Sequence, residues 1–122
     1  MNKNANEIKN RLNQFTGTEH YYRVSPLSEL VITDGVKYLC DHAGCYWLTD
    51  IIASYQPDCM KDEMLRDFQL WTLKVKDSKG EVIWERDTNN VAFTQKISHT
   101  YFPLSEITLY CENGVICLPS ER

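Results

Sequence analysis

Thiol and imidazole groups are concentrated in one short segment of the sequence. Cys40, His42 and Cys45 lie close together there, and thiolate sulfur and imidazole nitrogen are ligands that zinc prefers in proteins. A cysteine beside a histidine is also the pair that a thiol nucleophile requires. The spacing matches no common zinc pattern, however, and residues 40 and 42 of a helix point roughly 200° apart at about 100° per residue. We therefore predict no metal ligand, and retain a small metal-binding or thiol enzyme around these three residues as an alternative.

The remaining residues provide no recognisable catalytic motif. The other histidines, His20 and His99, lie outside any such motif, and the sequence contains no GxSxG, HExxH or P-loop pattern. We accordingly predict no catalytic residue and no cofactor, and favour a non-enzymatic function.

Aromatic and charged residues at 20–23, together with two residues of the second predicted helix, form the candidate binding site for a partner protein. Tyrosine and arginine are enriched at the energetic centres of protein interfaces, and loops carry function more often than core elements do. The alternative is that Tyr21 and Tyr22 pack under their loop as a lid on the core. The candidate partner-binding residues are His20, Tyr21, Tyr22, Arg23, Tyr46 and Asp50.

Charge and composition exclude several classes of partner. The chain has 122 residues and a formal net charge of −4, without a run of lysine or arginine, so nucleic-acid binding is disfavoured. No apolar run approaches the length of a membrane-spanning helix, and the first residues do not resemble a signal peptide. The five cysteines are an odd number with irregular spacing, which favours reduced thiols. We therefore expect a cytoplasmic protein whose mild acidity suits a basic partner.

Two central helices are predicted to position Tyr46 and Asp50. Apolar residues recur at helical spacing over 34–43 and again over 45–55. Thr33 and Asp34 are suitable N-terminal caps, and Gly44 stands where a left-handed residue would end the first helix. The alternative is one continuous helix that contains this glycine, at a cost of about 1 kcal/mol relative to alanine.

The second half of the chain changes to the period-two pattern of strands. Asn113-Gly114 is a strong signal for a two-residue hairpin turn, which would pair Cys111 with Ile116. On the preceding strands, Trp71, Trp84 and Phe93 are predicted to form a cross-strand aromatic cluster. The predicted strands are 69–76, 81–87, 91–98, 106–112 and 115–118.

The first half contributes a helix at 4–15 and a short helix that Asp58 or Asp62 would cap and that ends at about Phe68. Irregular structure is predicted at 18–32, and a break at Pro57 and Asp58. Helices that precede strands in the sequence indicate an α+β fold. We predict N-terminal helices packed on one face of a roughly five-stranded antiparallel meander sheet. The prediction is a single domain over 1–122, with 1–15 as a loosely attached helix.

Six segments resemble an uncharacterised bacterial family of small proteins, classed as a domain of unknown function. The segments occur in the family's order and cover most of the chain from Phe15 onward. The resemblance implies a bacterial or mobile-element setting and transfers no functional residue to this sequence. The segments are FTGTEHYYR, TDGVKYL, HAGCYWLTDIIASYQ, FQLWTLKV, FPLSEITLY and ENGVICLPSE.

These observations together favour a cytosolic protein-binding module. By analogy, it would be a phage- or plasmid-encoded inhibitor or accessory factor. A second alternative to this function is a homo-oligomeric structural module, in which the short final strand at 115–118 pairs across subunits.

Overall fold

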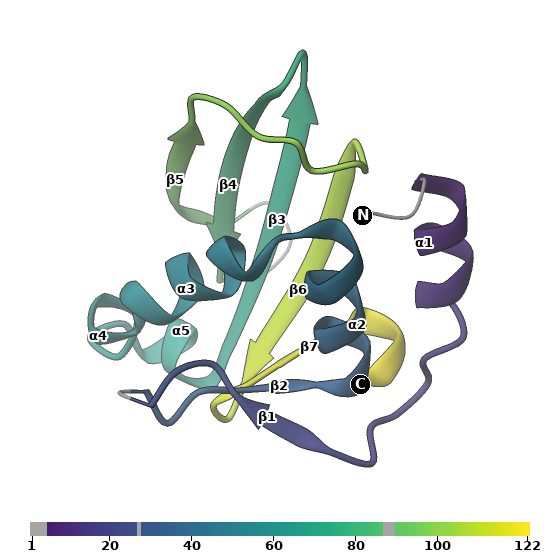
Figure 1. Cartoon of the computed structure of the whole chain (residues 1–122). Helices are drawn as coiled ribbons and strands as arrows, with labels where there is room; N and C mark the ends of the chain where they lie inside the picture. The colour runs from purple at the N-terminus through teal and green to yellow at the C-terminus, as the bar shows by residue number, and fades with distance from the viewer. Residues whose placement is uncertain (1–4, 27, 87–89) are drawn as a thin grey trace.

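The computed structural model of the chain describes residues 5–26, 28–86 and 90–122, and these residues form a mixed α/β fold (Figure 1). Residues 1–4, within the predicted segment 1–15, and Asp87, within a predicted strand, lie outside the described residues. The described helices are α1 (Ala5–Leu12), α2 (Asp34–Ala43), α3 (Tyr46–Ser54), α4 (Gln56–Cys59), α5 (Glu63–Asp67) and the 3₁₀ helix η1 (Pro119–Glu121). The described strands are β1 (Tyr21–Arg23), β2 (Val31–Thr33), β3 (Phe68–Lys76), β4 (Lys79–Glu85), β5 (Val91–Ile97), β6 (Glu106–Glu112) and β7 (Val115–Cys117).

In the described part of the chain, the sheet has seven strands in the order β1-β2-β7-β6-β3-β4-β5. All pairs are antiparallel except β2 and β7, which run parallel. The predicted five-stranded meander is therefore wrong in strand number and in order. The connection at 98–105 returns across the end of the sheet, so that β6 pairs with β3 and not with its predecessor β5 (Figure 1).

Strands β1 and β2 correct the prediction of irregular structure at 18–32. Each has only three residues, too short for an alternating pattern to stand out. β2 is ordered by its pairing with β7, in which Val31 lies opposite Val115 and Ile32 opposite Ile116. This partner comes from the far end of the sequence, so local patterns could not indicate it.

The two central helices are confirmed as separate elements. Gly44 has the left-handed backbone (φ 65°) that ends α2. The hydroxyl of Thr33 accepts the backbone N–H of Val36 at 3.4 Å and caps the start of the same helix. The predicted break at Pro57 is wrong, since Pro57 lies in the first turn of α4, where its missing N–H is not needed.

The core centres on two stacked tryptophans. The rings of Trp71 and Trp84 lie 4.6 Å apart between centroids and are inclined by 19°, and Tyr55 from the end of α3 packs on Trp84 at 4.5 Å. Phe93 lies 5.5 Å from Trp84 but remains 54% exposed. The predicted aromatic cluster is confirmed, and Phe93 forms its solvent-facing margin.

The final hairpin is confirmed in register, but its second strand is not an edge. Asn113 and Gly114 both have positive φ, and Cys111 lies opposite Ile116. β7 is enclosed between β2 and β6, whereas β1 and β5 are the outer strands of the described sheet. The predicted pairing of 115–118 across subunits therefore lacks the free edge that it needs.

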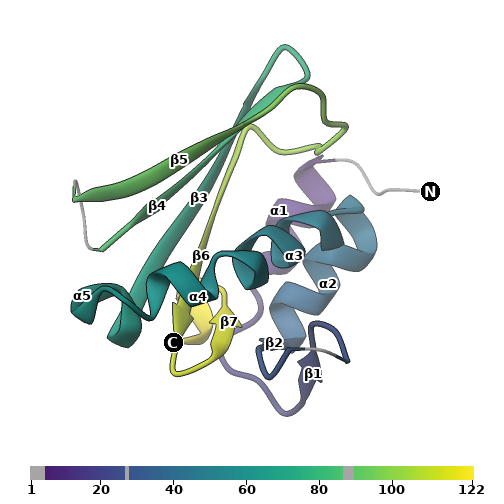
Figure 2. The same cartoon turned by 90° about the vertical axis from the view of Figure 1, so that its left-hand side faces the viewer.

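The predicted packing of the N-terminal helices on one face of a meander is also wrong in detail. α2 contacts β1, β2 and β7, α5 contacts β3, and the helices lie to one side of β3 to β6 (Figure 2). α1 packs beside α2 and places Ile8 and Leu12 in the core. None of the described helices combines the length and apolar character that crossing a bilayer requires.

A polar junction connects the start of α2 to residues near the C-terminus. The Glu121 carboxylate accepts hydrogen bonds from the Thr33 hydroxyl (2.6 Å), the Gly35 N–H (3.1 Å) and the Leu118 N–H (3.0 Å). A Cβ atom at position 35 would lie 2.6 Å from a Leu118 methyl and 2.8 Å from the Glu121 carboxyl carbon. Because Gly35 has no side chain, the Glu121 carboxylate has room beside the start of α2. We call Thr33, Gly35, Leu118 and Glu121 the α2 junction.

Candidate functional site

Asp34 connects β1 to the first turn of α2. Its carboxylate accepts the backbone N–H of Glu19 at 2.9 Å and the hydroxyl of Tyr22 at 3.0 Å. These two bonds hold the pKa of Asp34 below its ordinary value of 3.8. The bond that Tyr22 donates to Asp34 raises the pKa of the phenol, so the hydroxyl stays protonated at neutral pH. His20 Nδ1 lies 3.8 Å from the same carboxylate.

Lys37 connects the two predicted halves of the site. Its ammonium lies 5.3 Å from the Tyr22 ring centroid, 3.0 Å from an Asp41 oxygen and 3.5 Å from the Tyr46 hydroxyl. Tyr46 donates its hydroxyl to the other Asp41 oxygen. This bond, followed by the one from Lys37, lowers the pKa of Asp41, while Asp41 raises the pKa of Lys37.

The resulting surface joins side chains from β1, α2 and α3, together with the residues just before β1. We call it the tyrosine surface and define it as His20, Tyr22, Asp34, Lys37, Asp41 and Tyr46. The two phenols stay neutral while the lysine and the two carboxylates are charged, so the surface offers aromatic area together with fixed charge. Aromatic residues of this kind are enriched at protein interfaces.

The structure brings together three of the six predicted partner-binding residues, namely His20, Tyr22 and Tyr46. Tyr21 and Arg23 point to the other side of β1, because successive side chains of a strand alternate. Asp50 is exposed one helical turn beyond Tyr46.

Sequence reasoning missed Asp34, Lys37 and Asp41. These residues lie at positions i, i+3 and i+7 of α2, the spacing that places side chains on one helix face, opposite the apolar residues. A polar row of this kind usually indicates only a solvated face. Only the fold shows that this row lies beside the half-buried Tyr22 and the exposed Tyr46.

Cys40 and Cys45 are buried, with their sulfurs 3.9 Å apart. His42 instead packs its ring on Tyr38, with a centroid distance of 4.2 Å. No group of three or more potential metal ligands occurs in the part of the chain that the structure describes. The hydrogen bond to Cys40, together with burial, raises the pKa of Cys45, which disfavours the thiolate that a nucleophile needs.

The other thiols with shifted pKa values are also held in the protonated form. Burial raises the pKa of Cys111 to about 12, and raises the pKa values of Cys59 and Cys117 to about 11. Buried thiols with such values behave as small apolar groups.

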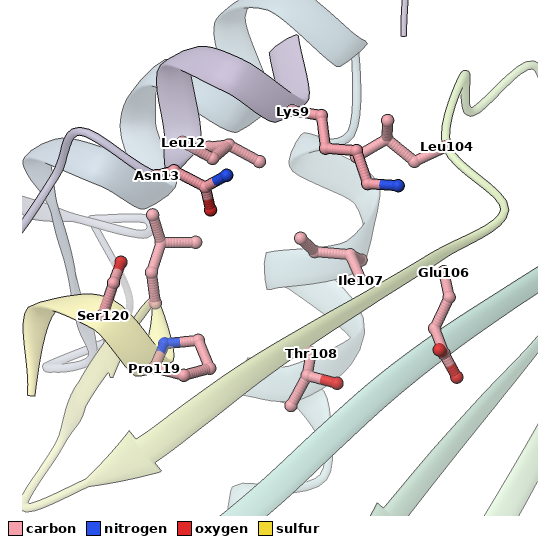
Figure 3. A pocket seen from close by; sticks show the side chains of 10 residues that line it. Lys9, Leu12, Asn13, Leu104, Glu106, Ile107, Thr108, Pro119 and Ser120 are labelled. Atoms are coloured by element: carbon pink, nitrogen blue, oxygen red, sulfur yellow. The ribbon is translucent and has the colours of Figure 1, made fainter. Parts of the chain in front are cut away.

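A groove between α1 and β6 is the second candidate site (Figure 3). It encloses about 310 Å³. Ile107 points toward α1, whereas the side chains of Glu106 and Thr108 point to the opposite side of the strand (Figure 3). The sequence offered one indirect signal, Pro119, which follows the last strand and cannot extend its hydrogen-bond ladder.

Comparison with known proteins identifies the family. The chain belongs to the family described as "Family of unknown function (DUF6876)", whose model matches residues 6–122. The resemblance noted in the sequence is therefore confirmed. No curated protein and no solved structure matches the chain.

Proposed function

We propose that this member of DUF6876 is a non-enzymatic, cytosolic protein-binding module that contacts its partner through the tyrosine surface. The observation that carries the proposal is the placement of Lys37, which contacts tyrosines from two different elements at once. Side chains that are already held in place lose less conformational entropy when a partner binds. Tyrosine is also among the residues that dominate binding energy at interfaces.

Charge indicates the kind of partner. The tyrosine surface carries two carboxylates and one ammonium, and the chain as a whole has a formal net charge of −4. A partner with a basic contact surface would be electrostatically complementary and would associate faster at low salt. The finer proposal of a phage- or plasmid-encoded inhibitor or accessory factor rests on analogy with other small acidic proteins.

Tyr46 is the best residue for a test of this surface. It is 43% exposed, whereas Tyr22 is half-buried against the core and bonded to Asp34. Removal of Tyr22 would therefore affect stability as well as binding. Tyr101, which is 83% exposed and lies outside the tyrosine surface, provides the matched control.

The test is a pull-down with the tagged chain from a bacterium that encodes it, with mass spectrometry after a salt wash. We expect one partner in near-equal amount with the wild type and Tyr101→Ala, and loss of that partner with Tyr46→Ala. Equal capture by all three forms would exclude the tyrosine surface. An empty pull-down with every form would count against a protein-binding module.

A second candidate function is homo-oligomerisation through β5. This strand is an edge of the described sheet, and its Val91 and Phe93 are 50% and 54% exposed. Exposed edge strands with apolar side chains readily pair with another chain. Light scattering at high concentration would show a dimer that Phe93→Lys converts to a monomer, whereas a monomeric wild type would exclude this function.

A further inference from the structure

The first half of β6 is paired on one side only. β3 pairs with β6 along the whole strand, from Glu106 to Glu112. On the other side, β7 pairs only with Tyr110 to Glu112. Among the residues that the structure describes, no second strand pairs with Glu106 to Leu109. This free edge, at Glu106 to Thr108, forms one wall of the groove shown in Figure 3.

The antiparallel pattern identifies which backbone groups face the groove. The N–H of Val75 donates to the carbonyl of Ser105 at 2.8 Å, so Ser105 directs its backbone groups toward β3. Successive residues of a strand alternate in this direction. Ile107 and Leu109 are thus bonded to β3, whereas the N–H and C=O groups of Glu106 and Thr108 point into the groove.

The described part of the chain, residues 5–26, 28–86 and 90–122, does not fill this edge. Continuing the register from Tyr110 opposite Cys117 would place Pro119 opposite Thr108, but proline has no N–H to donate. The N–H of Leu118 donates to the Glu121 carboxylate instead. The α2 junction therefore turns the chain away into η1, and α1 forms the far wall of the groove.

We propose that this groove binds an extended peptide segment of a partner protein, which pairs with Glu106 to Thr108 as an added strand in line with β7. Strand addition of this kind gains affinity from main-chain hydrogen bonds and specificity from pockets for alternate side chains. The site shares no residue with the tyrosine surface. It is a second contact, beyond the function proposed above.

The groove also defines the side chains that such a peptide would carry. The peptide residue opposite Ile107 points inward, where Leu12, Leu104 and Leu118 line the cavity, so an aliphatic side chain fits. The residue opposite Glu106 lies on the outer face beside its carboxylate, which favours lysine or arginine.

The peptide direction follows from β7, which runs antiparallel to β6. Read from its N-terminus, the matching segment is polar, aliphatic and basic, opposite Thr108, Ile107 and Glu106 in turn. The side chains of Asn13 and Ser120 also line the groove (Figure 3) and offer polar groups that can bond the peptide.

The experiment uses a random decapeptide phage library selected against the whole chain, followed by synthesis of the most enriched peptide. We expect enrichment of the polar–aliphatic–basic triplet. In amide exchange measured by NMR, the N–H groups of Thr108 and Glu106 should exchange rapidly in the free protein and slow by about tenfold or more with bound peptide. Ile107 and Leu109 should be slow in both states. Failure to enrich any peptide, or an enriched peptide that leaves the exchange of Thr108 unchanged, would overturn the proposal.

A matched pair of variants isolates the backbone contribution. Thr108→Pro removes the N–H that faces the groove and leaves pairing with β3 intact, as proline on an edge strand allows. It should weaken peptide binding by about tenfold, the effect of losing a hydrogen bond and leaving its partner unsatisfied. Thr108→Val retains the N–H and should bind within about twofold of the wild type. Equal affinity of both variants would contradict strand addition.

Two further measurements distinguish strand addition from a folding defect and from binding at the tyrosine surface. N-methylation of the peptide at the residue opposite Thr108 removes the donor on the other strand and should weaken binding in the same way, even if Thr108→Pro fails to fold. Tyr46→Ala should bind the peptide as the wild type does. The pull-down thus tests binding at the tyrosine surface, and the peptide measurements test binding in the groove. Either proposal can be contradicted without the other.

Discussion

The tryptophan pair in the core and the α2 junction stabilise the same sheet by different means. Trp71 and Trp84 come from adjacent strands of one hairpin, and both are 1% exposed. The α2 junction is polar and joins Thr33 and Gly35 to Glu121 across most of the sequence. The tryptophan pair stabilises the sheet through buried apolar area, and the hydrophobic effect does not depend on the direction of a contact. The α2 junction depends on directional hydrogen bonds to one carboxylate.

This difference affects how each region tolerates change. A core of stacked rings tolerates small shifts but loses stability when volume is removed. The α2 junction is sensitive to any change in the position of one side chain, because three donors share that carboxylate. Substitutions in the two regions can test this contrast, and the tryptophan pair should give the greatest loss of stability.

Trp71→Ala should lower the free energy of unfolding by about 3–5 kcal/mol, the range for deletion of a buried aromatic side chain. It removes the ring stacked on Trp84 and the indole N–H that donates to Gln69. Urea unfolding followed by circular dichroism is the measurement. Phe93→Ala, at a site that is 54% exposed, is the control and should cost about 1 kcal/mol. Equal losses would show that the stacked pair is not the centre of the core.

Glu121→Ala should lower the free energy of unfolding by about 1–3 kcal/mol, since it leaves the donors of the α2 junction without their acceptor. Glu121→Gln retains one acceptor oxygen and should lose less. The same urea experiment measures both variants. A Glu121→Ala protein as stable as the wild type would mean that water replaces the carboxylate without loss, and the contrast with the core would then rest on the tryptophans alone.

Gly35→Ala should cost about 1–3 kcal/mol, as overpacking does, because the new methyl would displace Leu118 and Glu121. When combined with Glu121→Ala, the total loss should be smaller than the sum of the two, since either change removes the same contact. Gly17→Ala is the control, because a Cβ at position 17 meets nothing within 4 Å. Strict additivity would show that Gly35 and Glu121 act independently.

Acid should affect the start of α2 before it affects the tryptophan core. The pKa of Asp34 is below 3.8 in the folded chain, so its bonds stabilise the fold above the unfolded pKa, and this contribution is lost as pH falls through the lower folded value. Amide exchange at β1 and α2 should therefore accelerate below about pH 4, while exchange at Trp71 should not. In Asp34→Asn, acid should no longer accelerate exchange at β1 and α2 before it accelerates exchange at Trp71. If acid accelerated exchange in both regions of the wild type at the same pH, the role given to Asp34 would be contradicted.

The parts of the fold that sequence alone predicted are those set by neighbouring residues. Gly44 ended one helix, and Asn113-Gly114 fixed the register of the last hairpin. The strands at 21–23 and 31–33 were not predicted, because they form by pairing with each other and with β7. The order of the sheet was missed for the same reason, since sequential pairing is only the commonest arrangement.

The site was predicted in part for a similar reason. Residue type alone indicated Tyr22 and Tyr46, but only the fold shows that Lys37 lies between them. The groove was not predicted, because it depends on where β7 stops and where α1 lies. Pro119 indicates the first position indirectly, but no local pattern indicates the second.

The position of Glu121 also has a consequence for synthesis of the chain on the ribosome. β2 has no partner on its β7 side until residues 115–117 have been made, and the carboxylate at the start of α2 arrives later still. Long-range pairing of this kind must wait for its loop to close. The β2–β7 pairs and the bonds to Glu121 therefore form only after residues 115–121 are free to fold, and until then β2 and the start of α2 lack these partners.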